Sequence, residues 1–419
     1  MSHDSFGMMQ RNRGSLVVGL GAIGALLGLA RSAHATACSA LPTAVPIVYI
    51  ENGDTQEPLI KRLGARLVAS TTPIRIVYKN KRTCDLALDL YTTPPNKLVA
   101  DAIATKYIPT PTEDPTWTPL SVTPTCDPDA GGNDIGLGIG ATFLSSCANL
   151  PAPPAGIAQF KGPTQSYGFI VPDASSQIAL TAQEGYFAFG YTQGTGMASP
   201  WVDQALRFSR GPTASTALTC SAAIGLKASQ LRGTVPVGNT STEVLNFVAT
   251  SGNPEPTIGL MGTEVYDGAR NLVKLLAFKG FEQRYAYFPD STSTSFDKRN
   301  VRDGHYLPWA PTPYITYVDG TGKATDPNVQ RIIDLVVGTR VDPDVNGIDQ
   351  VIASGLVPDC AMAVQRAFDG GDLSLYAPSQ SCACYFESKV PQGSTKCTTC
   401  TSDAQCGTGK CHRGYCEVR

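Results

Sequence analysis

A cluster of hydroxyl side chains follows an arginine in the middle of the chain, and side chains at this spacing could together bind an anion. Thr213, Ser215 and Thr216 lie downstream of Arg210, where helix-forming residues begin. A helix N-terminus presents unpaired N–H groups and the positive end of the helix dipole. Together with a guanidinium and hydroxyls, such a terminus predicts a pocket for an oxyanion. The competing interpretation is that the hydroxyls only cap the helix, as Ser and Thr commonly do.

The segments around this stretch alternate between short apolar runs and helical patterns. This alternation predicts an α/β fold with largely parallel sheets. In such sheets ligands bind beyond the carboxyl ends of the strands, against helix N-termini. Strands are expected at 47–50, 74–78, 134–139, 166–171, 205–208, 257–261 and 273–278, helices at 57–70 and 326–337, and capping boxes at Thr181 to Glu184 and Thr240 to Glu243. The loops expected to line one cleft are 54–55, 82–83, 138–139 and 210–216.

The length and charge of the chain limit its function further. With 419 residues it can bury a large core and form two lobes or domains. The formal net charge is −2 and only 16% of the residues are charged. Because there is no basic excess, nucleic acid is not an expected partner.

The first 37 residues have the pattern of an export signal. Arg11 and Arg13 precede an apolar run at 16–30, and small residues alternate up to Ala37. The run is too short to span a bilayer comfortably. The mature protein is therefore expected in the periplasm or at the cell surface.

Cys38 directly follows the expected processing site, as in a lipoprotein. The chain has 13 cysteines, and acylation of Cys38 would leave twelve to pair. Contact with the membrane is expected only if Cys38 carries lipid.

The chain ends in a cysteine-rich tail at 382–419. It has no apolar periodicity, so disulfides are expected to replace a hydrophobic core. A zinc site is the alternative, because Cys397 and Cys400 are spaced as metal ligands and His412 lies nearby. Since no second pair of cysteines has that spacing, disulfides are favoured and the tail is interpreted as a contact or anchoring module.

Few residues are available for catalysis or metal binding. Once the export signal is removed, only His305 and His412 remain of the histidines, and the proximity of Asp303 to His305 is typical of a polar turn. The aspartates in VDPDVNGIDQ resemble the start of a calcium loop, but no glutamate follows at the twelfth position, and helix capping explains them. The chain is not expected to be an enzyme, and no catalytic residue, metal or cofactor is predicted.

Several segments, in order along the chain, carry a family resemblance. They are IVYIENGDTQEPL, IRIVYKNKRTC, NDIGLGIGATF, GPTQSYGFIVP, RFSRGPTAST, PTIGLMGTEVYDGARNLVKLLAFKG and NVRDGHYLPW. Together they resemble the periplasmic phosphate-binding proteins that feed ABC uptake systems. The resemblance implies a type II periplasmic-binding-protein fold, in which two α/β lobes close on a ligand. It places the first part of lobe I at 38–150, lobe II at 151–305, and the return of lobe I at 306–381.

Two loops of the resemblance lie in the first part of lobe I. The first loop in the family reads Gly-Ser/Ala-Thr, and this chain has Gly53, Asp54 and Thr55. Thr55 keeps its hydroxyl, whereas Asp54 adds a carboxylate that would repel an anion. The second loop usually reads Gly-Ser, and here Arg82 and Thr83 keep a hydroxyl and add a charge.

The other two loops differ in what they retain. The third loop in the family supplies an aspartate that accepts the proton of hydrogen phosphate, and the corresponding stretch 138–140 has no carboxylate. The fourth reads Arg-x-x-x-Ser-Gly-Thr in the family, and Arg210 and Thr216 match it, with Ser215 between them. The residues that the resemblance implies for ligand binding are Thr55, Thr83, Arg210, Ser215 and Thr216.

Two functions follow from these observations. The first is an extracytoplasmic solute-binding protein that binds a small phosphate-like oxyanion and delivers it to the membrane subunits of an ABC transporter. The alternative is a surface interaction protein that keeps the two-lobed scaffold without a small-molecule ligand. The position of Asp54 distinguishes them: a carboxylate that pairs with Arg210 or Arg82 favours the alternative, whereas one that turns away leaves room for an anion.

Overall fold

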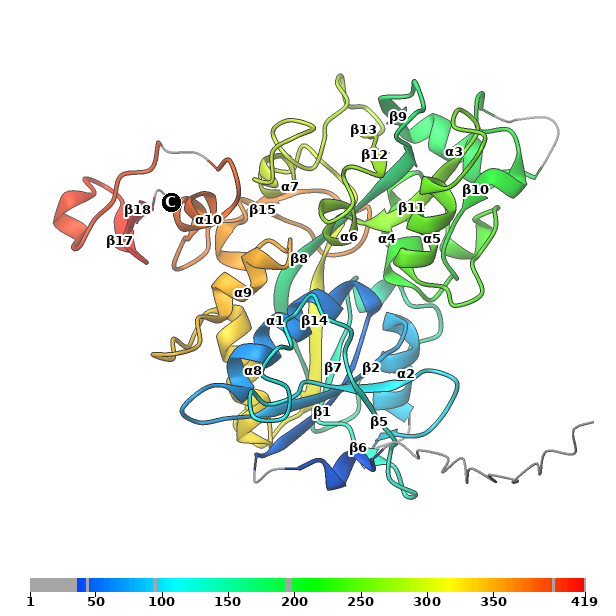
Figure 1. The fold of residues 1–419 in the computed structure, drawn as a ribbon. Helices are drawn as coiled ribbons and strands as arrows, with labels where there is room; N and C mark the ends of the chain where they lie inside the picture. Colours follow the sequence, from blue (N-terminus) through cyan, green and yellow to red (C-terminus); the bar gives the residue numbers. More distant parts are fainter. Residues whose placement is uncertain (1–35, 43–44, 93–95, 193–197, 394–395, 418–419) are drawn as a thin grey trace, which may run out of the picture. The chain divides into compact units, whose positions relative to one another are not determined.

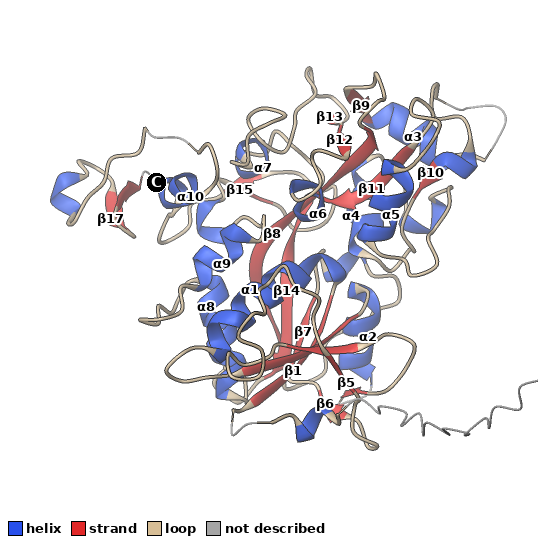
Figure 2. Cartoon of the chain, viewed as in Figure 1, coloured by secondary structure: helices blue, strands red, loops and turns tan. Residues whose placement is uncertain are grey.

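Two β-sheets that share one long strand form the framework of the protein. The computed structural model describes residues 36–42, 45–92, 96–192, 198–393 and 396–417. Residues 1–35 of the expected export signal lie outside the described residues. Figure 1 shows the fold in chain order, and Figure 2 shows the distribution of helices and strands.

The first sheet is built on parallel strands connected by helices. Strand β1 (Ile47–Asn52) pairs in parallel with β2 (Arg75–Asn80) on one side and with β7 (Leu137–Ile139) on the other. Helix α1 (Glu57–Val68) connects β1 to β2, and α2 (Thr83–Thr92) follows β2. Because helices pack on the sheet, nearly all of β2 is buried.

Two long antiparallel strands connect the first sheet to the second. Strand β8 (Ile157–Pro172) pairs over most of the length of β14 (Trp309–Tyr317), and β14 also pairs with β7. The later half of β8 pairs with β11 (Ile258–Gly262) and β12 (Val273–Leu275), so β8 belongs to both sheets.

The second sheet carries the helices that follow the arginine of the predicted site. Its outer strand β10 (Arg207–Phe208) pairs in parallel with β11, and helices α4 (Ser215–Ala223) and α5 (Ser241–Ala249) pack on β11. The remaining elements are β3 (Lys97–Leu98), β4 (Thr105–Tyr107), β5 (Thr125–Cys126), β6 (Asn133–Asp134), β9 (Ala179–Thr181), α3 (Ala182–Gly190), α6 (Thr263–Asp267), β13 (Ala277–Lys279), α7 (Arg299–Arg302), α8 (Pro327–Val337), α9 (Gly347–Ala353), β15 (Val364–Gln365), β16 (Ser374–Leu375), α10 (Ala383–Lys389), β17 (Lys410–His412) and β18 (Tyr415–Glu417).

The predicted α/β architecture with two discontinuous lobes and a disulfide-linked tail is confirmed. Both predicted capping boxes are present, at Thr181 with Glu184 and at Thr240 with Glu243. The expectation of largely parallel sheets is wrong, because the strands that join the sheets are antiparallel. The exact lobe boundaries stay a prediction.

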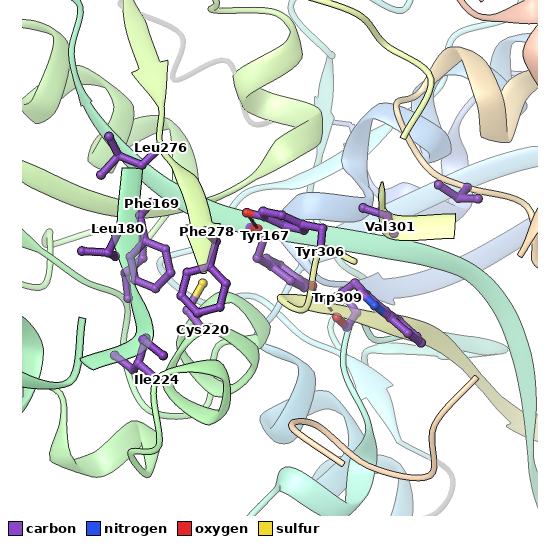
Figure 3. Close-up of a cluster of buried hydrophobic side chains, with 14 of the residues drawn as sticks. Tyr167, Phe169, Leu180, Cys220, Ile224, Leu276, Phe278, Val301, Tyr306 and Trp309 are labelled. Atoms are coloured by element: carbon purple, nitrogen blue, oxygen red, sulfur yellow. Dashed lines mark hydrogen bonds between the residues drawn. The ribbon is translucent and has the colours of Figure 1, made fainter. Parts of the chain in front are cut away.

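The largest core cluster lies around the second sheet. Phe169 on β8 stacks on Phe278 of β13 at 5.5 Å between ring centroids and also contacts Phe189 of α3. Figure 3 shows this cluster, with Tyr306 and Tyr167 adjoining the phenylalanine rings. Burial of such aromatic surfaces holds β8, β13 and α3 together.

The disulfides correct the prediction for Cys38. Cys38 is buried and bonded to Cys126, so its sulfur is not available for acylation. The unpaired cysteine among the described residues is Cys220, in the core. The other bridges are Cys84–Cys147, Cys360–Cys382, Cys384–Cys397, Cys400–Cys411 and Cys406–Cys416.

The tail is attached to the rest of the chain by more than its disulfides. The buried carboxylate of Glu417 accepts hydrogen bonds from the N–H groups of Cys384 and Tyr385 at 3.0 and 2.9 Å. The sulfur atoms of Cys400, Cys406 and Cys416 lie within 4.8 Å of one another because two disulfides are neighbours.

The aspartates of the calcium-like stretch bind protein groups instead. Asp342 pairs with Arg331 at 2.7 Å, and Asp344 accepts from the backbone of Thr71. Among the described residues, no helix is both long and apolar enough to cross a bilayer.

We expect Phe169→Ala to lower the free energy of unfolding by about 3–5 kcal/mol, because it leaves a cavity in the largest core cluster. Urea titration followed by tryptophan fluorescence would measure the change. Leu120→Ala is the control, since Leu120 is 87% exposed and its truncation should change stability by less than about 0.5 kcal/mol. Equal effects of the two substitutions would contradict this description of the core.

Candidate functional site

The first two predicted loops meet at Gly53. Thr55 lies in a 3-10 turn, η2 (Asp54–Gln56), ahead of α1, and Thr83 is the first residue of α2. A Cβ atom added at Gly53 would lie 3.7 Å from Oγ1 of Thr55 and 3.8 Å from Oγ1 of Thr83. The two hydroxyls therefore converge on one point, beside two helix N-termini.

The third and fourth predicted loops adjoin the same point. The N–H of Ala141, just after β7, donates to Oγ1 of Thr83 at 3.1 Å. The N–H of Cys84 donates to the carbonyl of Thr213 at 3.3 Å, which brings the loop before α4 against the start of α2. The structure thus brings together all four loops that the sequence assigned to one cleft.

The hydroxyls at the start of α4 do not cap that helix. Its N-cap residue is Ala214, which has no side-chain capping bond. Ser215 and Thr216 are both buried. Oγ1 of Thr216 and Oγ1 of Thr55 have no hydrogen-bond partner among the described residues. Buried hydroxyls without partners are uncommon, because leaving one unsatisfied costs about 1–3 kcal/mol.

Arg210 is buried and bonded to three side chains. Its Nη2 lies 3.1 Å from Oδ1 of Asp54, and its Nη1 donates to Oγ of Ser241 at 2.7 Å. Its Nε donates to Oδ1 of Asn239 at 3.1 Å. The guanidinium is 2% exposed, so the Asp54 carboxylate is its counter-charge.

The second oxygen of Asp54 is also bonded. Oδ2 accepts from the N–H of Ser241, the first residue of α5, at 2.9 Å. Burial alone would raise the pKa of the Asp54 carboxyl, but the Arg210 guanidinium and the Ser241 N–H outweigh it and hold this pKa below its ordinary value. Asp54 is therefore ionised at neutral pH and bound to the guanidinium that the resemblance assigns to an oxyanion.

Arg82 does not take part in this pairing. Its guanidinium is half exposed and pairs with Asp85 at 2.5 Å, one turn further along α2. Of the predicted site residues, Thr55 and Thr83 converge at Gly53, and Arg210 is bound to Asp54. Ser215 and Thr216 begin α4, whose preceding loop contacts the start of α2.

A second polar group lies beside Asp54. Nε2 of Gln56 donates to Oε1 of Gln165 at 3.2 Å, and Gln165 donates to Oε2 of Glu264. All three side chains are buried. Burial, together with the negative charge of Asp54, raises the pKa of Glu264 to about 8. Glu264 is thus mainly protonated at neutral pH.

Four residues of the site were not predicted from sequence patterns: Asn239, Ser241, Gln165 and Glu264. Asn239 precedes the capping box of α5 and Ser241 lies within it, and that box predicted only a helix start. Glu264 follows a buried strand at the start of α6. Its position at a strand end was the available signal.

Comparison with solved structures gives likenesses at low identity. A phosphate ABC transporter substrate-binding protein from Clostridium perfringens, described as putative and holding phosphate, is 12% identical, with a TM-score of 0.43 over 74% of this chain and 99% of that one. An ABC-type phosphate transport receptor from Vibrio cholerae is 13% identical, with a TM-score of 0.44 over 74% and 99%. The OxyR regulatory domain from Pseudomonas aeruginosa is 9% identical, with a TM-score of 0.37 over 69% and 95%.

All of these likenesses have identities of 9–13% and TM-scores below 0.5. No protein-family model matches the chain, and no curated protein does.

We expect Glu264→Gln to flatten the dependence of stability on pH between about 5 and 8. The folded protein keeps a proton on Glu264 up to a pH of about 8, whereas an unfolded Glu loses it near pH 4.3. Folding therefore takes up a proton in this window, and rising pH destabilises the wild type by up to about 1.4 kcal/mol per pH unit through this group. Chemical denaturation at several pH values would measure it, and parallel curves for wild type and variant would refute the assignment.

Proposed function

We propose that this chain is an extracytoplasmic interaction protein that has kept a two-lobed scaffold and fills the predicted anion position with its own Asp54. The observation that carries this proposal is the ion pair between Asp54 and the buried Arg210, at 3.1 Å. A carboxylate already occupies the guanidinium that an incoming oxyanion would need.

The pairing with Asp54 would weaken the binding of any free anion to Arg210. Asp54 is tethered to the same chain, so its effective concentration at Arg210 is on the order of millimolar or higher. It also accepts from the Ser241 N–H, and an anion would have to replace both contacts. An oxyanion would therefore bind only weakly unless the carboxylate moved away.

The disulfides support the extracytoplasmic location that we propose. Six bridges join described cysteines, and disulfides persist in oxidising compartments such as the periplasm and the cell surface. We propose that the cysteine-rich tail provides a contact surface there.

A second candidate function is the binding of a phosphate-like oxyanion for delivery to ABC transporter membrane subunits. The specific observation in its favour is that the hydroxyls of Thr55 and Thr216 are buried without partners, next to helix N-termini. An anion between Thr55, Thr83, Ser215 and Thr216 would accept from these hydroxyls. This candidate requires the Asp54 carboxylate to move away from Arg210, so that the anion can bind the guanidinium.

Asp54→Ala should strengthen the binding of phosphate, which the wild type binds at most weakly. Removing the carboxylate leaves the Arg210 charge without its counter-ion, so phosphate should bind at least roughly tenfold more tightly than to the wild type. Isothermal titration calorimetry with phosphate, sulfate, arsenate and molybdate on the mature protein would measure it. The double variant Asp54→Ala with Arg210→Met is the control and should not bind.

Each outcome separates the two functions. Micromolar phosphate binding by the wild type would overturn the interaction proposal and support the transport candidate. If Asp54→Ala binds no anion although it is folded, as judged by circular dichroism, then Asp54 is not what excludes the ligand.

A further inference from the structure

A hairpin near the end of the body connects the two sheets at a place away from Asp54. We call residues 357–376 the strap; it contains the antiparallel pair β15 and β16 and is drawn in orange in Figure 1. Its first residue, Val357, exchanges two backbone hydrogen bonds with Thr164 of β8, at 2.7 and 3.0 Å. The disulfide Cys360–Cys382 fixes the strap close to that point.

The tip of the strap carries a buried carboxylate. Oδ2 of Asp369 accepts from Oγ1 of Thr142 at 2.7 Å and from Oγ of Ser146 at 2.5 Å. Its Oδ1 accepts from Oγ1 of Thr219 at 3.1 Å. Asp369 is 8% exposed, so these three hydroxyls replace the water that an ionised carboxylate would otherwise bind.

The three hydroxyls belong to different halves of the fold. Thr142 and Ser146 lie in the loop that leaves β7 of the first sheet. Thr219 lies on α4, which packs on β11 of the second sheet. One carboxylate therefore joins the first sheet to a helix of the second sheet.

The backbone of the tip also fits closely on α4. Gly370 follows Asp369 with a φ of +73°, and a Cβ atom there would lie 3.3 Å from the carbonyl oxygen of Ala222. A side chain at this position would strain the turn and crowd the helix.

A second contact holds the arm of the strap against β14. The guanidinium of Arg366 lies 4.2 Å from the ring centroid of Trp309, and it donates to the carbonyl oxygen of the same residue. Burial lowers the pKa of Arg366 to about 10, although the negative charge of Asp369 acts to raise it. The strap is thus held at its first residue, Val357, at Arg366 and at Asp369.

We propose that the strap is an internal clamp that holds the two lobes closed without a ligand, by fastening the loop at 142–146 to α4 through Asp369. Separation of the lobes would move α4 away from this loop and break the Asp369 hydrogen bonds. The clamp acts in addition to the Asp54–Arg210 pair and does not depend on whether the cleft binds an anion.

Hydrogen–deuterium exchange on the full mature chain tests the clamp. Asp369→Ala should make the amides of 137–147 and 215–223 exchange roughly ten- to hundredfold faster, because opening no longer breaks the hydrogen bonds of the buried Asp369 carboxyl group. Asp372→Ala is the matched control, since Asp372 is an exposed carboxylate on the same hairpin. It should exchange like the wild type.

Thr219→Val is a milder variant that removes the hydroxyl on α4, with its contacts to Asp369 and to Oγ1 of Thr142, and leaves the bonds of Asp369 to Thr142 and Ser146. It should accelerate exchange in 215–223 more than in 137–147.

Small-angle scattering of the double variant Asp54→Ala with Asp369→Ala should give a larger radius of gyration than either single variant. Unchanged exchange in both Asp369→Ala and Thr219→Val would overturn the clamp, whereas phosphate binding by the wild type would overturn only the proposed function.

Discussion

The organisation of the predicted site depends on one buried guanidinium that requires a negative partner. A charge taken out of water is costly unless a counter-charge and hydrogen bonds replace its hydration. Arg210 receives these from Asp54, Ser241 and Asn239. Because Asp54 comes from the loop after β1 and the other two from the start of α5, the pair joins the two sheets. The electrostatic requirement of a single side chain therefore becomes a contact between the halves of the fold.

This arrangement changes what the helix N-termini near Gly53 can attract. Without Asp54, the N-termini of α1, α2 and α4 and the charge of Arg210 would together produce a positive potential. The carboxylate neutralises the guanidinium and accepts from the N–H at the start of α5. What remains for a ligand is the weaker attraction of neutral donors such as Thr55 and Thr216. Hydroxyls of this kind can equally be satisfied by water, which explains why they alone do not identify an anion site.

The sequence predicted the meeting of the four loops because the α/β rule depends only on local patterns. Strand ends followed by helix starts can be predicted from apolar spacing, whereas Asp54 stood out only through the family resemblance, which implies Ser or Ala at that position. The bond between Cys38 and Cys126 was not, because pairing over 88 residues depends on the folded sheet. The same limit applies to Asp369, which lies 227 residues from Thr142, and to the antiparallel pairing of β8 with β14.

Three carboxyl groups with little exposure to solvent are stabilised in three different ways. Asp54 is ionised and paired with a guanidinium, whereas Glu264 is protonated because burial raises its pKa to about 8. Asp369 accepts from hydroxyls of both sheets. In a protein whose cleft opens to admit a ligand, such groups would regain water in the open state. Here Asp54 and Asp369 are bonded to partners from the other sheet, so the contact between the sheets satisfies these two carboxyl groups without a ligand.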